Sequence, residues 1–425
     1  MKQASLIIKE IQDCCCDEIL KNVYVDEQLV GTQRQRYCDA IQKFIELYGD
    51  IDVEIYSTPG RSEVCGNHTD HQHGEVLAAA INLDIIAVVS PCQDVIKVLS
   101  DDYDIKAIHM NDLSMKEDEK GTSEGLIRGV CARYQELGYQ IGGFYAYMTS
   151  DVLQGSGLSS SAAFEVAIGT VLSGLYNNMS IDPVLIAQIG QYSENVYFGK
   201  PCGLMDQCAC SVGSLIHIDF KNQDHPIVEK IEVDFPEFKH SLCIVDVHAS
   251  HADLTDDYAS IPYEMKEVAH YYGQEFLRDV NEKQFYQDLS EIRKTVGDRA
   301  VLRAIHLFEE NKRVEKAVSA LNSGNFDAFK NVIQISGKSS YQYLQNIYSN
   351  HHVQQQAVSI ALALSEMILE DHGVCRVHGG GFAGTIQAFV EDEFVDYYKE
   401  SIEKYFGDGS CHILKVRKDG GIKVI

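Results

Sequence analysis

Basic residues are scarce in this chain. Lys and Arg together number 36 against 63 Asp and Glu, and the formal net charge at pH 7 is -27. A field of that sign repels polyanions, so we expect neither nucleic acid nor an anionic membrane as a partner. A small anion such as a nucleotide can still bind, because backbone amides and one or two cations act locally. The acidity therefore excludes classes of partner and indicates solubility, but it assigns no function.

Several targeting and redox signals are also missing. No apolar run approaches the roughly 20 residues of a membrane-spanning helix, and the N-terminal segment carries charges every few residues, unlike a signal peptide. The 13 cysteines form no evenly spaced framework and no Cys-x-x-Cys pair, which favours reduced thiols. These absences predict a cytoplasmic protein. Tryptophan is absent too, so stacking on an adenine ring would need Tyr or Phe.

What is present predicts two α+β domains. A length of 425 residues exceeds one average core, and no low-complexity tether separates the halves. We expect helical structure up to about residue 48, then a strand over 52–56 that ends in a turn at 57–61. Asp182 and Pro183 frame the start of a helix that ends before Gly199. We place the domain boundary between residues 1–225 and 226–425.

Two glycine clusters are candidates for contact with phosphate. The segment 155–163 places two glycines, four serines and a helix start within nine residues. Glycines allow the backbone to approach an anion, and free N–H groups at a helix N-terminus favour negative charge. The segment is neither a Walker A loop nor a dinucleotide fingerprint, and an ordinary serine-capped turn is the alternative. The second cluster, 378–384, precedes a strand and could serve packing alone.

A polar loop and two distant carboxylates complete the candidate chemistry. Residues 61–74 mix hydrogen-bond donors and acceptors between two apolar stretches, which suits a polyol better than zinc, because the loop's histidines have no second ligand segment. Asp206 and Glu194 lie among apolar and small residues. If Arg61 pairs with Asp206, the aspartate stays ionised and can accept a proton from an attacking hydroxyl. A buried structural ion pair is the alternative.

These residues resemble the GHMP kinase family, and within it the galactokinases. Residues 58–74 resemble the signature PGRxNxxGEHTDYNxG, residues 155–163 match GxGLSSSAA, and residues 379–384 resemble GGGFGG, in the expected order. The resemblance spans most of the chain. It implies a two-domain α+β fold, with a ribosomal protein S5-like N-terminal domain and a ferredoxin-like C-terminal domain. It also implies in-line transfer of the γ-phosphoryl group of ATP, with Mg²⁺, to the C1 hydroxyl of galactose.

The resemblance also implies roles for individual residues. Arg61 and Asp206 match the catalytic arginine and the general base, and Ser161 and Glu194 match the magnesium ligands. The expected ATP-binding residues form one run, namely Gly155, Ser156, Gly157, Leu158, Ser159, Ser160 and Ser161. The expected sugar-binding residues are Asn67, His68, Asp70, Gly203 and Tyr258. A monomer or weak oligomer is expected, with the sugar and ATP as small-molecule partners.

Two departures from the signature bear on the substrate. Glu63 replaces the signature asparagine and Asn67 replaces its glutamate, which contacts the C6 hydroxyl in the family. An uncharged amide at position 67 would also tolerate a C6 carboxylate, so galacturonate is an alternative substrate, and arabinose is another. An inactive sugar and ATP sensor is a further alternative, although the intact residues Arg61, Asp206, Ser161 and Glu194 argue against it.

Overall fold

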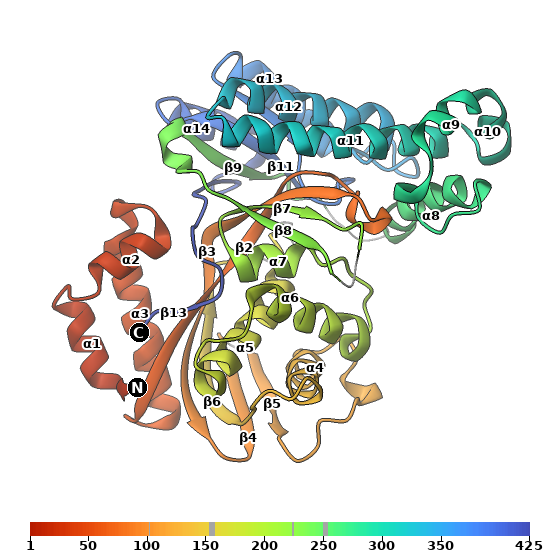
Figure 1. Ribbon diagram of the computed structural model, residues 1–425. Coiled ribbons are helices and arrows are strands. Elements are labelled where there is room, and N and C mark those ends of the chain that lie inside the picture. The colour runs from red at the N-terminus through yellow and green to blue at the C-terminus, as the bar shows by residue number, and fades with distance from the viewer. Residues whose placement is uncertain (102, 153–157, 223–224, 250–253) are drawn as a thin grey trace.

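Two β-sheets organise the chain (Figure 1). The structure is a computed structural model that describes residues 1–101, 103–152, 158–222, 225–249 and 254–425. The first sheet has the order β1-β2-β3-β6-β4-β5, with β13 beside β2 and with β7 joining β3 to β8. Its strands are β1 Lys2–Gln3, β2 Asp52–Cys65, β3 Glu75–Cys92, β4 Val95–Ser100, β5 Tyr103–His109, β6 Gly143–Ser150, β7 Leu215–Asp219, β8 Ile227–Ile231 and β13 Ile422–Lys423.

The second sheet is smaller and lies beside the C-terminal helices (Figure 1). Its order is β10-β11-β9-β12, with every described pairing antiparallel. These strands are β9 His240–Asp246, β10 Gly373–Val377, β11 Thr385–Glu391 and β12 Cys411–Leu414. In the first sheet, β4 and β6 are parallel and the other described pairings are antiparallel.

Helices cover both faces of the first sheet (Figure 1). Alternate side chains explain this, because Ile86 and Val88 of β3 face a core with the N-terminal helices, whereas Ala87 and Val89 face the main core. The N-terminal helices are α1 Ala4–Gln12, α2 Asp17–Tyr24 and α3 Val30–Tyr48. The opposite face is covered by α4 Ser123–Glu136, α5 Ser160–Asn177, α6 Pro183–Tyr192 and α7 Met205–Val212.

The C-terminal half is rich in helices, some of which lie above the second sheet in the view of Figure 1. Its helices are α8 Thr255–Tyr271, α9 Glu282–Gln287, α10 Leu289–Val296, α11 Asp298–Asn322, α12 Phe326–Ser339, α13 Ala357–Leu369 and α14 Val395–Phe406. Short 3-10 segments are η1 Glu27–Leu29, η2 Asp70–Gln72, η3 Glu117–Glu119, η5 Phe235–Phe238 and η6 Leu277–Asp279, and π-helical turns are η4 Ser193–Phe198 and η7 Ser340–Leu344.

The structure confirms some of the predicted helices and strands and contradicts one predicted turn. The N-terminal helical prediction is confirmed, and the Asp182 side chain accepts hydrogen bonds from the Val184 and Leu185 N–H groups at the start of α6. The turn predicted at 57–61 is wrong. Strand β2 instead continues to Cys65 against β3, with a register shift between Pro59 and Arg61. A bulge accommodates the proline there, because its missing N–H removes one ladder bond.

The chain returns to its first sheet at the C-terminus. Strand β13 pairs with β2, and a bridge joins Ile81 to Val416, so residues after 226 also complete the N-terminal sheet. Both chain ends lie on the same side of that sheet (Figure 1). The domain boundary at 225/226 stays a prediction, whereas the α+β class is confirmed by the two sheets and their helices.

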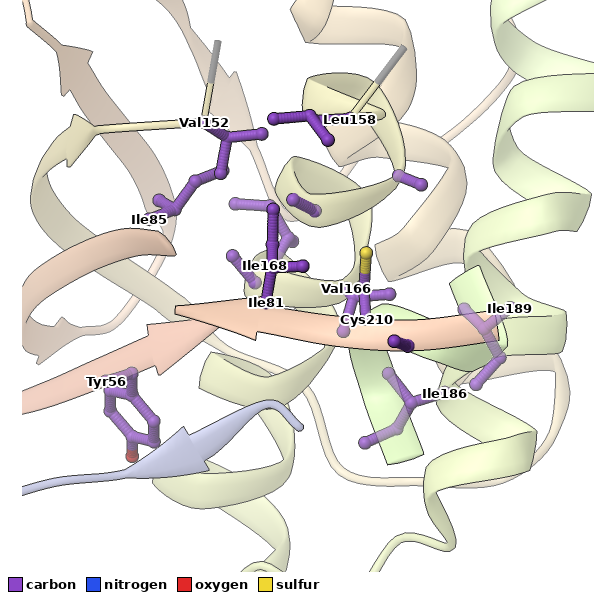
Figure 2. Close-up of a cluster of buried hydrophobic side chains, with 14 of the residues drawn as sticks. Tyr56, Ile81, Ile85, Val152, Leu158, Val166, Ile168, Ile186, Ile189 and Cys210 are labelled. Carbon is purple, nitrogen blue, oxygen red and sulfur yellow. The ribbon is translucent and has the colours of Figure 1, made fainter. Parts of the chain in front are cut away.

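A hydrophobic cluster fixes the helices that carry the candidate site. Figure 2 shows Ile81 and Ile85 of β3 near Val166 and Ile168 of α5, with Cys210 of α7 close by. All five side chains are buried. Burying an aliphatic side chain of this size contributes about 1.5 to 3 kcal/mol relative to exposure, so α5 and α7 are held firmly to the sheet.

Candidate active site

Arg61 and Asp206 form a bidentate ion pair, although 145 positions separate them in the chain. Arg61 Nε donates to Asp206 Oδ1 at 2.7 Å, and Nη2 donates to Oδ2 at 2.6 Å. Arg61 follows the bulge in β2, and Asp206 lies in the first turn of α7, where the helix dipole favours a negative charge. The structure therefore brings together the two residues predicted to be catalytic.

The pair is charged at neutral pH. Burial acts to raise the pKa of Asp206, but the Arg61 guanidinium and hydrogen bonds from Arg61 and Ser159 lower that pKa below its ordinary value. Burial likewise opposes the charge on Arg61, and Asp206 raises the pKa of Arg61 overall. An ionised carboxylate that one oxygen of a substrate could approach is suited to accept a proton.

The end of the predicted phosphate loop lies directly on this pair. Gly155, Ser156 and Gly157 are outside the described residues, but the Leu158 carbonyl accepts a hydrogen bond from the Arg61 N–H at 3.2 Å. Figure 2 shows Leu158 above the cluster that anchors α5.

Ser159 continues this contact at the start of α5. Its backbone is left-handed, with φ of 59°, and its hydroxyl donates to Asp206 Oδ2 at 2.6 Å. Ser160 and Ser161 then form the first turn of α5, for which no side chain supplies a capping hydrogen bond within the described residues. The N–H groups of that turn can therefore face an anion.

A second acidic group lies behind Asp206. Gln207 Nε2 donates to Glu165 Oε2 and to Glu194 Oε2, each at 3.0 Å, and Lys200 Nζ lies 3.5 Å from Glu194 Oε1. Glu194 was predicted as a metal ligand, whereas Glu165 was not predicted. Its one available signal was a lone carboxylate in an apolar helix, four residues after Ser161 and therefore on the same helix face.

The charge state of Glu165 differs from that of an ordinary carboxylate. Burial first, and then the neighbouring charge of Glu194, raise the pKa of Glu165 well above its ordinary value. The raised pKa favours the protonated form of Glu165. Among the described residues, no group of three His, Cys, Asp or Glu side chains is placed to hold a metal ion, so a cation at Glu194 would need hydroxyl or ligand oxygens as well.

Two of the three predicted motifs, the sugar loop and the third glycine cluster, line one cavity of about 240 Å³. Residues from the sugar loop, the segment before α7 and the third glycine cluster line it, together with the catalytic pair. They are Arg61, Glu63, Asn67, His68, Asp70, His71, Lys200, Pro201, Cys202, Gly203, Met205, Asp206, Gly379 and Gly380. Lys200 was not predicted, because a single lysine in a loop carries no pattern.

The sugar loop is shaped by close contacts at two of its predicted residues. A side chain on Gly203 would collide with Asp70 Oδ2, so only glycine permits this approach. His68 Nε2 donates to the Gly380 carbonyl at 3.0 Å, and burial lowers the pKa of His68 to about 4, which leaves the ring neutral. His68 thereby joins the sugar loop to the third glycine cluster.

Tyr258 supports that cluster from the other side. Its hydroxyl donates to the Gly381 carbonyl at 2.9 Å, and its ring lies against Gly380, where an added Cβ would come within 2.7 Å. Tyr258 does not line the cavity in the part of the chain that the structure describes. Its predicted contact with the sugar stays a prediction.

Helix α11 contacts the backbone of the sugar loop. His306 Nε2 donates to the Asn67 carbonyl at 2.9 Å, and Glu310 Oε1 accepts from the Gly66 N–H at 3.2 Å. Arg313 Nε donates to Glu310 Oε2 at 2.6 Å, which pairs the buried carboxylate. Burial lowers the pKa of His306 to about 4, so the ring is neutral. These contacts come from residues more than 200 positions away and could not be predicted from the loop itself.

Comparisons with known proteins agree with this arrangement. Residues 42–91 match the galactokinase galactose-binding signature, and residues 125–214 match the GHMP kinases N terminal domain. A galactokinase of Actinobacillus pleuropneumoniae serotype 3 is 31% identical over 370 residues, which cover 85% of this chain and 92% of that protein. The chain belongs to the galactokinase family. A galactokinase of Streptomyces coelicolor is 29% identical and covers 86% of this chain and 92% of its own length.

Two solved structures share the fold of this chain. Lactococcus lactis galactokinase complexed with galactose superposes with a TM-score of 0.75, at 22% identity, over 90% of this chain and 98% of that one. A mevalonate kinase superposes with a TM-score of 0.59, at 17% identity, over 86% of this chain and 99% of that one. The two-domain GHMP kinase fold is therefore confirmed. None of the helices in the described ranges combines the length and apolar character that crossing a bilayer requires.

Proposed function

We propose that this protein is a galactokinase, which transfers the γ-phosphoryl group of ATP to the C1 hydroxyl of galactose. The observation that carries the proposal is the bidentate pair of Arg61 and Asp206 in the wall of the cavity that the sugar loop encloses. Ser159, at the start of α5, contacts the same aspartate. The acceptor site and the expected phosphate site therefore meet at one carboxylate.

The charges at this meeting point suit phosphoryl transfer. Asp206 accepts the proton of the C1 hydroxyl as the oxygen attacks phosphorus, because the neighbouring Arg61 lowers its pKa and so keeps the carboxylate ionised and free of a proton. Arg61 stabilises the negative charge on the phosphoryl group in flight. The first turn of α5 directs N–H groups toward the phosphates, and no covalent enzyme intermediate is needed.

The oxygen donors near α5 suit a hard divalent cation. Ser161 and Glu194 would hold Mg²⁺, since hydroxyl, carboxylate and phosphate oxygens are the ligands that this ion prefers. When bound with ATP, Mg²⁺ neutralises charge on the phosphate oxygens. Lys200, 3.5 Å from Glu194, supplies a further positive charge at the same wall. We further propose a cytoplasmic location and a monomer or weak oligomer.

The test is ADP release with galactose, galacturonate, arabinose and N-acetylgalactosamine, for the wild type and for Asp206→Asn. We expect galactose to give the highest kcat/KM, and Asp206→Asn to lower kcat by about 10² to 10⁴-fold with little change in sugar affinity, because the general base is lost. Asp408→Asn, in an exposed turn after α14, is the matched control. Near-normal turnover by Asp206→Asn would remove this residue from the base role.

A galacturonate kinase is the second candidate. Lys200 lines the cavity and could pair with a sugar carboxylate. Galactose is favoured, because Glu63 places a carboxyl group in the same cavity and Lys200 already lies beside Glu194. A kcat/KM for galacturonate well above that for galactose would reverse this choice.

A further inference from the structure

Asn67 has no hydrogen-bonding capacity left for a sugar. Its Nδ2 donates to the Gly379 carbonyl at 2.7 Å and to the Glu63 carboxylate at 3.1 Å. Its Oδ1 accepts from Asn346 Nδ2 at 2.7 Å and from the Ser340 hydroxyl at 3.4 Å. An amide has two hydrogens and two lone pairs, so protein groups fill all four positions. The side chain is also fully buried.

Glu63, by contrast, has acceptor capacity to spare. Its Oε1 receives Asn67 Nδ2 and, at 3.3 Å, Arg376 Nη2, whereas the one donor to Oε2 among the described residues is Asn67 Nδ2, at 3.2 Å. A carboxylate can accept about four hydrogen bonds. Burial raises the pKa of Glu63 to about 7, although Arg376 and the hydrogen bond from Asn67 act to lower it.

The Glu63 side chain also lies on the same face of β2 as Arg61, toward the cavity. Arg61 and Glu63 are two residues apart on a regular stretch of β2, opposite Ala80 and Ala78 of β3. Side chains at such positions leave a strand on the same face, roughly 6 to 7 Å apart. Both line the cavity, so a sugar whose C1 hydroxyl meets Asp206 beside Arg61 would present another hydroxyl to Glu63.

We propose that Glu63, rather than Asn67, determines sugar specificity in this chain. The Glu63 carboxylate accepts a hydrogen bond from one hydroxyl other than the C1 hydroxyl, and it selects neutral sugars against those that carry a carboxylate. Asn67 is a positioning residue that ties Glu63 to the third glycine cluster through Gly379. This inference rests on the proposed kinase function and assigns the part of the site that recognises the sugar.

The test compares wild type and Glu63→Gln on galactose and on its four monodeoxy analogues, each lacking the hydroxyl at C2, C3, C4 or C6. For galactose we expect Glu63→Gln to lower kcat/KM at least about tenfold, mostly through KM, because one charge-assisted hydrogen bond is lost. For one analogue only, the substitution should change kcat/KM by less than about threefold, because contacting groups are not additive. That analogue identifies the recognised hydroxyl.

A merely structural role for Glu63 would lower activity equally on every sugar, and that result would overturn the inference. A preference of the wild type for galacturonate over galactose would overturn it too. If Glu63→Gln does not fold, Glu63→Asp is tested on the same series. Glu54→Gln is the matched control, because Glu54 is also on β2 but pairs with Lys423 outside the cavity.

The proposed function and this inference fail differently. A wild type that turns over no neutral sugar contradicts both. Normal galactose turnover with a uniform loss across the analogues contradicts only the role of Glu63. Galactose binding by wild type and Glu63→Gln, followed by the shift in melting temperature without ATP, gives a second readout that does not depend on catalysis. We expect the shift to shrink in Glu63→Gln and to persist in Glu54→Gln.

Discussion

The two walls of the cavity differ in how their polar groups are satisfied. On the sugar side, Asn67 contacts Gly379 and Asn346, and Glu310 accepts hydrogen bonds from Gly66 and Arg313. On the phosphate side, the buried Glu165 Oε1 has no partner within the described residues, and no side chain there caps the first turn of α5. Asp206 lies between the two.

This difference fits two kinds of ligand. A neutral sugar gains affinity from polar groups that are already fixed, because little reorganisation remains to be done on binding. A nucleotide with its cation brings charge of its own and can satisfy groups that the protein leaves open. Substitutions of the buried polar residues on the sugar side should therefore mainly lower the free energy of unfolding. Substitutions on the phosphate side should mainly lower kcat.

The largest expected effect is on the sugar wall. Glu310→Ala should lower the free energy of unfolding by about 3 to 5 kcal/mol, because the buried Arg313 loses its partner. Urea denaturation measures this. Glu309→Ala is the matched control, since Glu309 pairs with Lys312 at the surface and such pairs contribute about 0 to 1 kcal/mol. Equal effects of the two substitutions would contradict a rigid sugar wall.

The same carboxylate predicts acid sensitivity. Burial acts to raise the pKa of Glu310, but His306 where its ring is protonated, together with the charges of Arg313 and Arg376, lowers that pKa from 4.5 to about 2. A depressed carboxyl pKa stabilises the fold above the ordinary value, and this stability is lost as pH falls through the folded value. The wild type should lose its advantage over Glu310→Ala between pH 4.5 and about 2, as measured by urea denaturation across that range.

The next largest effect is expected at the ion pair of Arg61 and Asp206, which lies between the sugar side and the phosphate side. Arg61→Lys should lower kcat about 10² to 10³-fold, because an ammonium group cannot reproduce the two parallel hydrogen bonds to Asp206. Steady-state ADP release measures it. Arg133→Lys, which alters an exposed pair with Glu136, is the control and should leave kcat unchanged. A normal kcat for Arg61→Lys would mean that a positive charge at this position is enough for catalysis and that the bidentate hydrogen bonds are not needed.

A smaller effect is expected where the sugar wall is tightest. Gly203→Ala should raise the KM for galactose about tenfold, because the added methyl group displaces Asp70 while the catalytic pair stays in place. The kcat should change less than KM does. Gly31→Ala is a fair comparison, since a Cβ there meets open space and alanine favours its helix, α3. An unchanged KM in Gly203→Ala would argue that Asp70 does not contact the sugar.

Features that depend on neighbouring residues were predicted from the sequence more successfully than features that depend on pairing between distant segments. Asp182 and Gly199 mark their helix through capping, which depends on neighbouring residues only. The family motifs predicted that Arg61 and Asp206 meet. By contrast, the strand through 57–61 depends on pairing with β3, because turn-like residues inside a long hydrogen-bonded ladder remain extended at a bulge.

The residue that we propose to recognise the sugar also depends on contacts that are distant in sequence. Sequence alone named Asn67, because it replaces a glutamate of the signature. The structure shows instead that Glu63 and Asn67, the two departures, are hydrogen-bonded to each other. It also shows that Asn346, 279 positions away, donates a hydrogen bond to Asn67 Oδ1. No pattern within the loop carries that information, since a partner so distant in sequence is set by tertiary packing.

The smallest expected effect lies deep in the phosphate wall. Glu165→Gln should change the free energy of unfolding by less than about 1 kcal/mol and kcat by only a few fold, because the raised pKa favours the uncharged form of Glu165 and an amide has a similar shape. Glu194→Gln should lower kcat far more, since it removes a charge that faces the proposed cation. Urea denaturation and ADP release on both variants test this contrast. Equal losses would mean that both carboxylates are ionised and that Gln207 joins two charges rather than one.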